Sequence, residues 1–354
     1  MKVLSDKDIV AYLDSKLTQK SILEDFQPAL VNSLRTYGDD PNKIVPPRIA
    51  QVSNNEKSDT THLFMPCISP DEVGIKVISG GQGNNAKGLG FQGCVLIMDE
   101  ITGSLKAVLN AGTLTAFRTA LASTLGLTKV ISVDKDGLLP EVAVFGVGAQ
   151  AYWHVKLTLI LYQGKFTTVN ILNRTLKNAE ALAATLSSEF KDIKFNSYSY
   201  QDPEVEQDLT DHVRNSSVIF GCTPSTVPII KKDYINSNAK YPKFISLIGS
   251  YKPHMIELDL AIVEELKTSG VSIIVDSKEH TLHEAGELIQ GDITENELIE
   301  IPDLYVGEIS SSTFTLASSN LTVQKLVGLS IMDLSVGKYI SEDAGDVGVD
   351  IPDF

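Results

Sequence analysis

The sequence predicts a two-lobed α/β protein in which an N-terminal α+β lobe precedes a doubly wound α/β lobe. Between residues 61 and 110, short apolar runs alternate with turns rich in Gly and Asn, which is typical of short, mostly antiparallel strands. From about residue 140 onward, apolar strands alternate with helical stretches, which indicates βαβ units on a parallel sheet. A chain of 354 residues is long enough for two such domains.

Helical periodicity outlines the remaining elements of the first lobe. The first 40 residues are predicted to be helical because their apolar side chains recur at roughly helical spacing. Residues 113–128 predict a buried helix with Thr113 or Thr115 as its N-cap. Residues 322–341 predict a final amphipathic helix that returns to the first lobe, followed by a loosely ordered acidic tail. We therefore assign residues 1–128 with 312–354 to one domain and residues 129–311 to the other.

The composition of the chain indicates which kinds of binding partner and which cellular compartment to expect. The chain has 30 basic and 45 acidic residues and a formal charge of −15, so its surface repels phosphate backbones and we expect no nucleic-acid partner. We expect no signal peptide in the N-terminal residues and no membrane span, since no apolar run is long enough for one. Three scattered cysteines lack metal-ligand spacing. We expect a cytoplasmic protein without a metal site.

A glycine motif opens the second lobe. The segment "FGVGAQA" supplies Gly146, Gly148 and Ala151 as G-x-G-x-x-A between a predicted strand and a predicted helix, where a dinucleotide-binding fingerprint requires it. Gly146 permits a tight turn, Gly148 lets the backbone approach a pyrophosphate, and Ala151 allows close packing of the helix on the strand. We include Ala149 and Gln150 among the predicted cofactor contacts. The alternative interpretation is a plain tight turn.

The end of the second strand distinguishes the two nicotinamide cofactors. An NAD site usually has Asp or Glu there to accept a hydrogen bond from the adenosine ribose. This chain instead has Asn173, Arg174 and Thr175, and a guanidinium can pair with a 2′-phosphate. The sequence therefore favours NADP(H), with NAD(H) as the alternative cofactor. In the alternative interpretation, Arg174 is a solvated surface residue without a role in cofactor binding.

Three basic residues of the first lobe are embedded in apolar sequence. Arg48 follows two prolines, Lys76 lies within the predicted strand "VGIKVIS", and Arg118 lies in the opening turns of the predicted helix 113–128. A buried cation is unfavourable unless it is paired, and a substrate carboxylate would supply the partner. Alternatively, each is a surface charge with a buried stem. We expect Arg48, Lys76 and Arg118 to anchor a small organic anion.

The sequence resembles the ornithine cyclodeaminase/mu-crystallin family over about residues 45–340. The segments that carry the resemblance include "PPR" (46–48), "DEITGSLKAVLNAGTLTAFRTALAST" (99–124), "VFGVGAQAYWH" (144–154), "NRT" (173–175), "GCTPSTVPI" (221–229) and "VDSKEHTLHEAGEL" (275–288). The resemblance implies a homodimer with a Rossmann-type dinucleotide-binding domain and an α+β substrate/dimerisation domain. It implies binding of α-amino or α-imino acids whose carboxylate is held by Arg48, Lys76 and Arg118. Thr119, Thr223 and Ser225 are further candidate cofactor contacts.

Departures from the family pattern bear on the reaction. True cyclodeaminases carry an Asp shortly after the "IG" strand, and here the matching residue is Tyr251. Tyrosine is a poor base near neutrality, so the sequence resembles more closely the members that use NADPH to reduce cyclic imines of 2-oxo acids. Lys76 or Tyr251 is then the candidate proton donor. Ornithine cyclodeaminase and a non-catalytic NADPH-binding protein remain the alternative functions.

Overall fold

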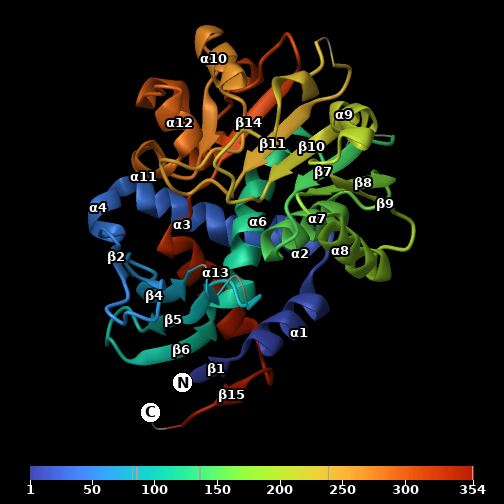
Figure 1. The fold of residues 1–354 in the computed structure, drawn as a ribbon. Coiled ribbons are helices and arrows are strands. Elements are labelled where there is room, and N and C mark those ends of the chain that lie inside the picture. Colours follow the sequence, from blue (N-terminus) through green and yellow to red (C-terminus); the bar gives the residue numbers. More distant parts are fainter. Residues whose placement is uncertain (82, 85–86, 135–136, 238, 353) are drawn as a thin grey trace. The chain divides into compact units, whose positions relative to one another are not determined.

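In the computed structural model the chain divides into two compact units (Figure 1). The structure describes residues 1–81, 83–84, 87–134, 137–237, 239–352 and 354. Unit 1 consists of Met1–Thr119 with Gly328–Phe354, and unit 2 of Ala120–Val327. The first boundary falls inside helix α6 (Ala111–Val130).

Unit 1 contains a mixed sheet that is mostly antiparallel, as predicted. Among the described residues seven strands pair in the order β15-β1-β6-β5-β4-β3-β2, and only the pair β1–β6 is parallel. The strands are β1 (Lys2–Leu4), β2 (Ile49–Val52), β3 (Thr61–Ile68), β4 (Val73–Gly80), β5 (Gln92–Met98), β6 (Leu105–Asn110) and β15 (Val349–Asp350). The tail was predicted to be loosely ordered, and this was wrong for β15, which pairs with β1.

Unit 1 also contains helices, one of which packs on a face of the sheet. They are α1 (Asp6–Lys16), α2 (Gln19–Ser21), the π-turn η1 (Ile22–Phe26), α3 (Gln27–Asp39), α4 (Pro41–Ile44), the first part of α6, and α13 (Ser330–Asp343). Helix α13 packs on α3 and on β3 to β6, and its residues Ser330–Gly337 are all buried. Strand β4 alternates accordingly: Lys76 and Ile78 are buried, whereas Ile75 and Val77 face the opposite, partly exposed side.

The predicted N-cap of helix α6 was wrong. The helix begins at Ala111, and the hydroxyl of Thr115 donates to Ala111 O instead of accepting from the backbone. The first N–H groups are satisfied from outside the helix, because Gly112 N–H donates to Asn110 Oδ1 and Thr113 N–H donates to Asp6 Oδ1, each at 2.8 Å. Asp6 comes within reach because β1, which precedes it, pairs with β6.

Unit 2 has the predicted parallel sheet of Rossmann type. Eight described strands pair in the order β13-β12-β14-β11-β10-β7-β8-β9, and all the pairs are parallel. They are β7 (Glu141–Phe145), β8 (Thr168–Asn173), β9 (Lys194–Ser199), β10 (Ser216–Gly221), β11 (Lys243–Leu247), β12 (Ile273–Val275), β13 (Leu298–Glu300) and β14 (Leu321–Lys325). Chain order reverses between β7 and β10, where sheets of this kind bind ligands.

Helices cover both faces of this sheet, with α7 and α8 on one side and α9, α10 and α12 on the other (Figure 1). They are α7 (Ala149–Leu161), α8 (Leu176–Glu189), α9 (Glu206–Asn215), α10 (Leu260–Thr268), α11 (Lys278–Glu284) and α12 (Gly286–Gln290). Short 3₁₀ turns complete the unit: η2 (Pro203–Val205), η3 (Lys232–Tyr234), η4 (Glu295–Glu297), η5 (Ile301–Tyr305) and η6 (Ser311–Thr313). A cluster of buried apolar side chains, including Phe145, Ile219 and Val263, forms the core.

The predicted helix over 322–341 was wrong in its first part. Residues Leu321–Lys325 form strand β14, which is fully buried between β11 and β12. Gly328, with φ of +84°, separates this strand from helix α13. Thr322 and Val323 are β-branched and suit a buried strand, and tertiary pairing overrides the helical spacing of the apolar residues. The last helix belongs to unit 1, together with the rest of Gly328–Phe354.

Candidate functional site

Strand β4 turns the ammonium group of Lys76 toward the helices of unit 1. Lys76 is 1% exposed, and its Nζ lies 2.7 Å from Oδ1 of Asp333 on helix α13. Arg118, from helix α6, brings its Nε to 3.1 Å from Oδ2 of the same carboxylate. The contact of Arg118 is an ion pair without hydrogen-bond geometry, and the Asp333 side chain is completely buried. Two predicted anchors are therefore brought together.

The sequence predicts a substrate carboxylate as the partner of these cations, and this stays a prediction; the structure adds a partner that the sequence analysis did not name. Asp333 supplies the negative charge from within the chain. The sequence reasoning missed Asp333, although the same signal that marked Lys76 was present, because "SIMDLSV" places one charge within an apolar helix. Lys76 and Arg118 are paired before any ligand binds.

The cluster nevertheless keeps an excess of positive charge. Burial lowers the pKa of Lys76 to about 8; Asp333 opposes this shift, while the charges of Arg118 and Arg48 add to it. Arg48, half-buried just before β2, thus acts electrostatically on Lys76. Among the described residues, Lys76 and Arg118 share the single carboxylate of Asp333, so the charge of one small anion would be compensated there.

The guanidinium of Arg118 is held in place by the segment that leads into α13. Its Nη1 donates to Sδ of Met332 at 3.3 Å. A Cβ atom on Gly328 would lie 2.8 Å from Nη1 and 2.9 Å from Nη2, so the guanidinium rests directly on the backbone there. The predicted cofactor contact Thr119 is buried next to Arg118, and its hydroxyl donates to Thr115 O.

The glycine motif of unit 2 has the geometry that a dinucleotide requires. Gly146 adopts φ of +112°, and a Cβ there would lie 2.6 Å from Cys222 O. Gly148 is the N-cap of the 13-residue helix α7, and space is open beside it. Ala149 is exposed in the first turn, whereas Ala151 is fully buried against the sheet. Gln150 keeps a buried Oε1 without a hydrogen-bond partner. Backbone N–H groups at this helix N-terminus can bind a pyrophosphate.

The predicted ribose-side residues lie at the carboxyl end of β8. Asn173 ends the strand and its Nδ2 donates to Thr175 O at 3.0 Å. Arg174 is exposed, and its carbonyl accepts a hydrogen bond from Ser199 Oγ. Thr175 is the N-cap of α8, yet its side chain makes no capping hydrogen bond. The Arg174 guanidinium and the Thr175 hydroxyl together suit a phosphate group.

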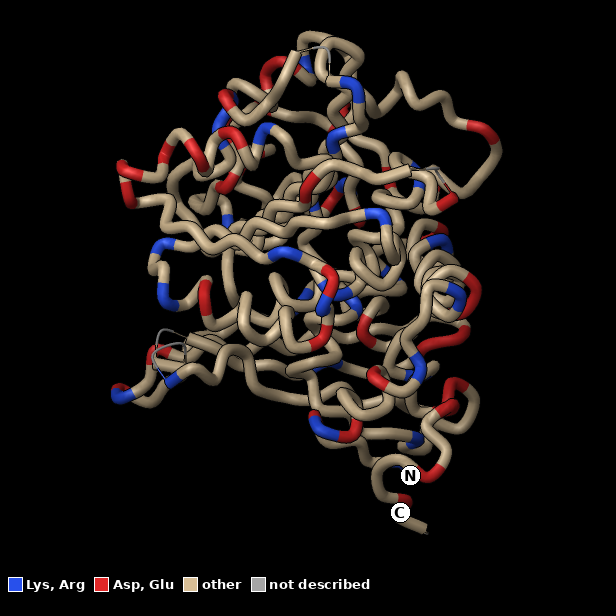
Figure 2. The backbone as a smooth tube through the Cα atoms, turned by 90° about the vertical axis from the view of Figure 1, so that its right-hand side faces the viewer, with Lys and Arg blue, Asp and Glu red and all other residues tan. Residues whose placement is uncertain are grey.

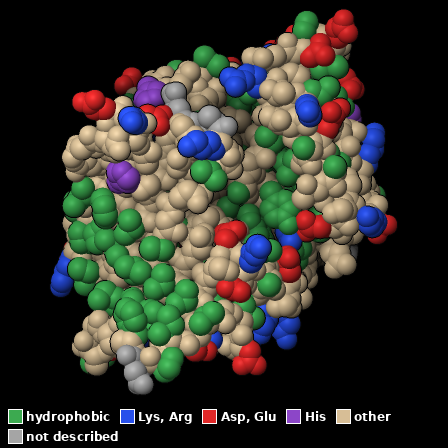
Figure 3. Space-filling model, turned by 60° about the horizontal axis from the view of Figure 1, so that its bottom comes forward, with side chains coloured by type: hydrophobic (Ala, Val, Ile, Leu, Met, Phe, Trp, Pro, Cys, Tyr) green, Lys and Arg blue, Asp and Glu red, His purple; other side chains and the backbone are tan. Residues whose placement is uncertain are grey.

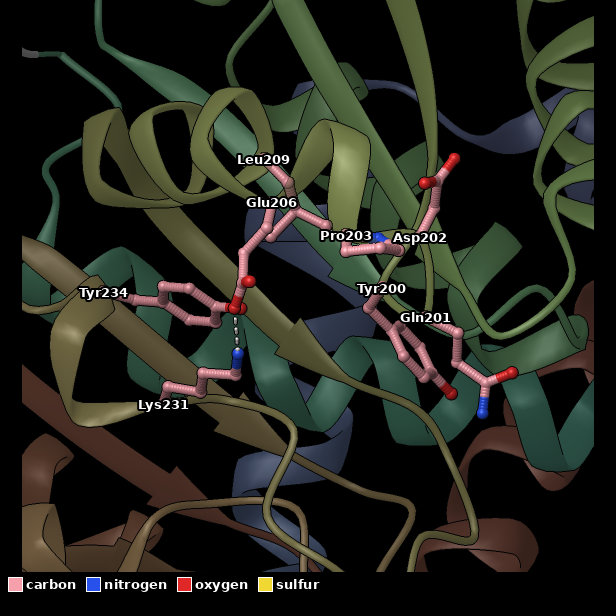
Figure 4. A pocket seen from close by; sticks show the side chains of 8 residues that line it. All are labelled: Tyr200, Gln201, Asp202, Pro203, Glu206, Leu209, Lys231 and Tyr234. Atoms are coloured by element: carbon pink, nitrogen blue, oxygen red, sulfur yellow. Dashed lines mark hydrogen bonds and ion pairs between the residues drawn. The ribbon is translucent and has the colours of Figure 1, made fainter.

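A small pocket lies next to this loop, beyond the end of β9 (Figure 4). Its volume is about 130 Å³, and it is lined by Tyr200, Gln201, Asp202, Pro203, Glu206, Leu209, Lys231 and Tyr234. An ion pair of 2.9 Å between Lys231 and Glu206 closes one side. The charge of Arg174 lowers the pKa of Tyr200, while burial raises it more strongly, so the pocket and Arg174 are neighbours. The sequence reasoning did not predict this pocket.

The remaining predicted residues occupy two loops at the carboxyl edge of the unit 2 sheet. Thr223, after β10, is buried and donates to Glu257, whereas Ser225 Oγ donates to Val227 O. Tyr251, after β11, is 36% exposed, and burial of part of its ring raises the pKa of its hydroxyl. Lys76 belongs to unit 1 and Tyr251 to unit 2.

Three further observations on the described residues concern metal ligands, the distribution of charge and membrane-spanning helices. Within the described ranges, no group of three His, Cys, Asp or Glu side chains could hold a metal ion. Basic residues are interspersed with acidic ones along the described backbone (Figure 2). No helix in that part of the chain is both long and apolar enough to cross a membrane.

Comparison with known proteins matches the chain to a protein family. A profile described as the ornithine cyclodeaminase/mu-crystallin family matches residues 10–347. An uncharacterised protein of Saccharomyces cerevisiae is 33% identical over 338 residues, covering 88% of this chain and 89% of the relative. The ketimine reductase mu-crystallin of Mus musculus is 28% identical over 281 residues, 78% of each chain. In fold, the chain is similar to Delta(1)-pyrroline-2-carboxylate reductase of Thermococcus litoralis, solved with NADH and L-proline, with a TM-score of 0.77, 24% identity and coverage of 99% and 100% of the two chains.

Proposed function

Because the chain belongs to the ornithine cyclodeaminase/mu-crystallin family, we propose that it is an NADPH-dependent oxidoreductase that reduces a cyclic imine of a 2-oxo acid, a ketimine, to the amino acid. The observation that carries the proposal is the buried cluster of Lys76, Arg118 and Asp333, with the charge of Arg48 acting on it. A relative named ketimine reductase supports the substrate class.

The substrate carboxylate would bind through Arg118 and Arg48. Arg118 offers a planar guanidinium fixed against Gly328, and only one of its nitrogens is committed to Asp333. A carboxylate bound there completes the charge balance that one aspartate leaves unfinished. The imine nitrogen of a cyclic 2-imino acid is attached to the carbon that bears this carboxylate, so anchoring the acid also fixes the position of the C=N bond.

Reduction of the C=N bond requires a hydride at carbon and a proton at nitrogen. Bound NADPH would supply the hydride to this carbon, and the nitrogen would take a proton from the protein, so that C=N would become CH–NH. Lys76 suits the role of proton donor, because its pKa of about 8 leaves it protonated at neutral pH and close to the optimum for a general acid. Tyr251 suits it less, since burial raises its pKa above the usual value for tyrosine.

The cofactor is NADP(H) rather than NAD(H) in this proposal. Arg174 and Thr175 follow β8 at the position where NAD sites carry a carboxylate. The glycine turn and the first turn of α7, including Ala149 and Gln150, would hold the pyrophosphate.

The cyclodeaminase reaction is the weaker alternative. It needs a carboxylate to hold or deprotonate the substrate amine, and the matching residue here is Tyr251, whose raised pKa makes it a poor base.

The active protein would be a homodimer formed through the outer face of the unit 1 sheet. The register places Phe64, Val77 and Cys94 side by side on this face, and Pro66, Ile75 and Leu96 in the next row. Phe64 is 39% and Ile68 57% exposed, and Figure 3 shows hydrophobic side chains gathered there. An apolar face of this extent fits a second copy of the same surface. Three free cysteines fit a reducing compartment, the cytoplasm.

An assay of catalytic turnover tests the proposed imine reduction. Purified protein with NADPH and Δ1-pyrroline-2-carboxylate or its six-membered homologue is expected to lose absorbance at 340 nm, and Arg118→Met is expected to abolish the loss without changing NADPH affinity. Release of ammonia and proline from ornithine would identify a cyclodeaminase instead. Tight NADPH binding without turnover across a panel of cyclic imino acids would identify a binding protein and overturn the proposal.

A further inference from the structure

A buried polar network lies at the carboxyl edge of the unit 2 sheet. It joins Glu257, Glu287, Lys325 and Ser250, all of them completely buried, to Thr223. The network connects the loop after β10 with the loop after β11. Neither the glycine motif nor the cation cluster of unit 1 includes any of these residues.

Glu257 bonds both loops with one carboxylate. Its Oε1 accepts from Thr223 N–H at 2.7 Å and from Thr223 Oγ1 at 2.8 Å. Its Oε2 accepts from Gly249 N–H at 2.7 Å. Three donors from two loops therefore converge on one side chain, and charge-assisted bonds of this kind are stronger than neutral ones.

The backbones that Glu257 joins are packed without room for side chains. A Cβ on Gly249 would lie 1.9 Å from Thr223 O, and one on Gly221 would lie 3.0 Å from Glu257 Cδ. The loop after β10 in turn contacts the glycine turn, because Cys222 O lies against Gly146. A shift of the Thr223 loop would thus be transmitted to the turn that approaches the pyrophosphate.

The charges of the network do not balance. Glu287 Oε1 accepts from Glu257 N–H at 2.8 Å and from the Ser250 hydroxyl, and its Oε2 lies 3.8 Å from Lys325 Nζ. Two carboxylates therefore share one ammonium group among completely buried side chains. One proton bound to a carboxylate would neutralise the remaining negative charge. The ionisation of the network is therefore sensitive to small changes in the groups around it.

We propose that Glu257 is a positioning residue for the cofactor: its ionised form holds the loops 222–225 and 248–251 in the conformation that accepts the dinucleotide, so that cofactor binding expels a proton from the network. This inference rests on the proposed function only in that the protein binds a nicotinamide dinucleotide. Burial and Glu287 raise the pKa of Glu257 to about 7, and Lys325 and the bonds from Thr223 oppose that shift. The other titratable groups that it influences are Cys222 and Tyr200, whose pKa values are raised chiefly by burial.

The wild-type protein gives the first test. NADH is the probe, because it lacks the 2′-phosphate, which itself titrates near neutrality. Calorimetry at pH 7 in two buffers of different ionisation enthalpy is expected to show release of a fraction of a proton on binding. The Kd for NADH is expected to show a pH step where Glu257 becomes protonated. Below this step the Kd should rise by up to about tenfold per pH unit. Binding with no proton release and no pH step would overturn the inference; absence of binding of either NADH or NADPH would instead overturn the proposed cofactor.

Variants separate positioning from general stability. Glu287→Gln removes the neighbouring negative charge and keeps an acceptor, so it is expected to move the pH step to lower pH. Glu257→Gln is expected to weaken NADH binding and to remove the step, because its amide would oppose Gly249 N–H. Glu141→Gln is the matched control: Glu141 accepts from Asn170 and His212 at the opposite edge of the sheet, and the step should stay in place. A step that is unmoved in Glu287→Gln, or retained in a folded Glu257→Gln, contradicts the inference.

Discussion

The ammonium nitrogen of Lys76 lies 2.7 Å from Oδ1 of Asp333, although the two residues are 257 positions apart. The contact joins strand β4 to the last helix of unit 1, and Arg118 adds a second cation to the same carboxylate. The electrostatics of the proposed substrate site therefore depend on Asp333 as much as on the basic residues that the sequence marked.

Replacing Asp333 with Asn keeps the shape and removes the charge. Two buried cations lose their partner, so the free energy of unfolding should fall by about 3–5 kcal/mol, measured by urea denaturation. Because Asp333 raises the pKa of Lys76, its loss should bring that pKa below 8 and move the alkaline limb of the pH–kcat/KM profile to lower pH. Asp343→Asn is the control on the same helix, where the ion pair with Lys16 is partly exposed and should contribute little to stability. An unmoved alkaline limb would argue against Lys76 as the proton donor.

Gly328→Ala should raise the KM for the imino acid while leaving the Kd for NADPH unchanged. The new methyl group would lie 2.8 Å from Nη1 of Arg118 and push the guanidinium from its position. The left-handed φ of +84° adds backbone strain of about 1 kcal/mol or more. Gly103→Ala isolates that strain, because Gly103 has φ of +72° and nothing near its missing Cβ. Equal KM values in the two variants would contradict a steric role for Gly328.

Arg174→Ala should remove the preference for NADPH. A charge-assisted bond to a phosphate is worth about 1.5–3 kcal/mol, so the KM for NADPH should rise about tenfold to a hundredfold while that for NADH stays nearly constant. Lys191→Ala, another exposed cation of unit 2, controls for general loss of positive charge. If the KM values for the two cofactors rise equally, Arg174 does not contact the 2′-phosphate.

Ile75→Glu should convert the dimer to a monomer. Ile75 lies between Pro66 and Leu96 on the outer face of the unit 1 sheet, and a carboxylate there could not be buried against a second copy. Light scattering after size-exclusion chromatography measures the mass. Ile101→Glu is the control, since Ile101 is 88% exposed in the turn between β5 and β6. A wild-type monomer would refute the proposed dimer.

The burial of Lys243 should make the stability of the protein depend on pH. Its buried Nζ donates to the carbonyls of Arg214 and Ser216, at the end of α9, and burial lowers its pKa to about 8. The unfolded chain therefore binds more protons than the folded one between pH 8 and about 10.4, and stability should rise with pH across that window. Lys76 contributes in the same direction. In Lys243→Met the rise in unfolding free energy between pH 8 and 10 should be smaller than in the wild type; an identical rise would show that Lys243 does not titrate there.

The features that could be predicted from the sequence are those that depend on local motifs. The turn at Gly146 and Gly148, the parallel sheet and the residues at the end of β8 all follow from patterns within a few dozen residues. Burial of Lys76 and Arg118 was also predictable, because each interrupts an apolar run.

The parts that were missed depend on contacts between distant segments. Residues Leu321–Lys325 have helical spacing, but β11 and β12 offer paired edges that draw them into the sheet. The identity of the partner of Arg118 required knowing that α13 returns beside α6, which no local pattern contains. The bonds from Thr223 and Gly249 to Glu257 are likewise set by the fold alone.

The position of β14 has a consequence for how the protein is made. It lies between β11 and β12, yet it is the last strand of unit 2 in chain order. A nascent chain therefore cannot close this sheet until residue 325 has left the ribosome, and until then β11 and β12 present open edges to other chains. A fragment that stops before Leu321 would carry both edges permanently and should aggregate.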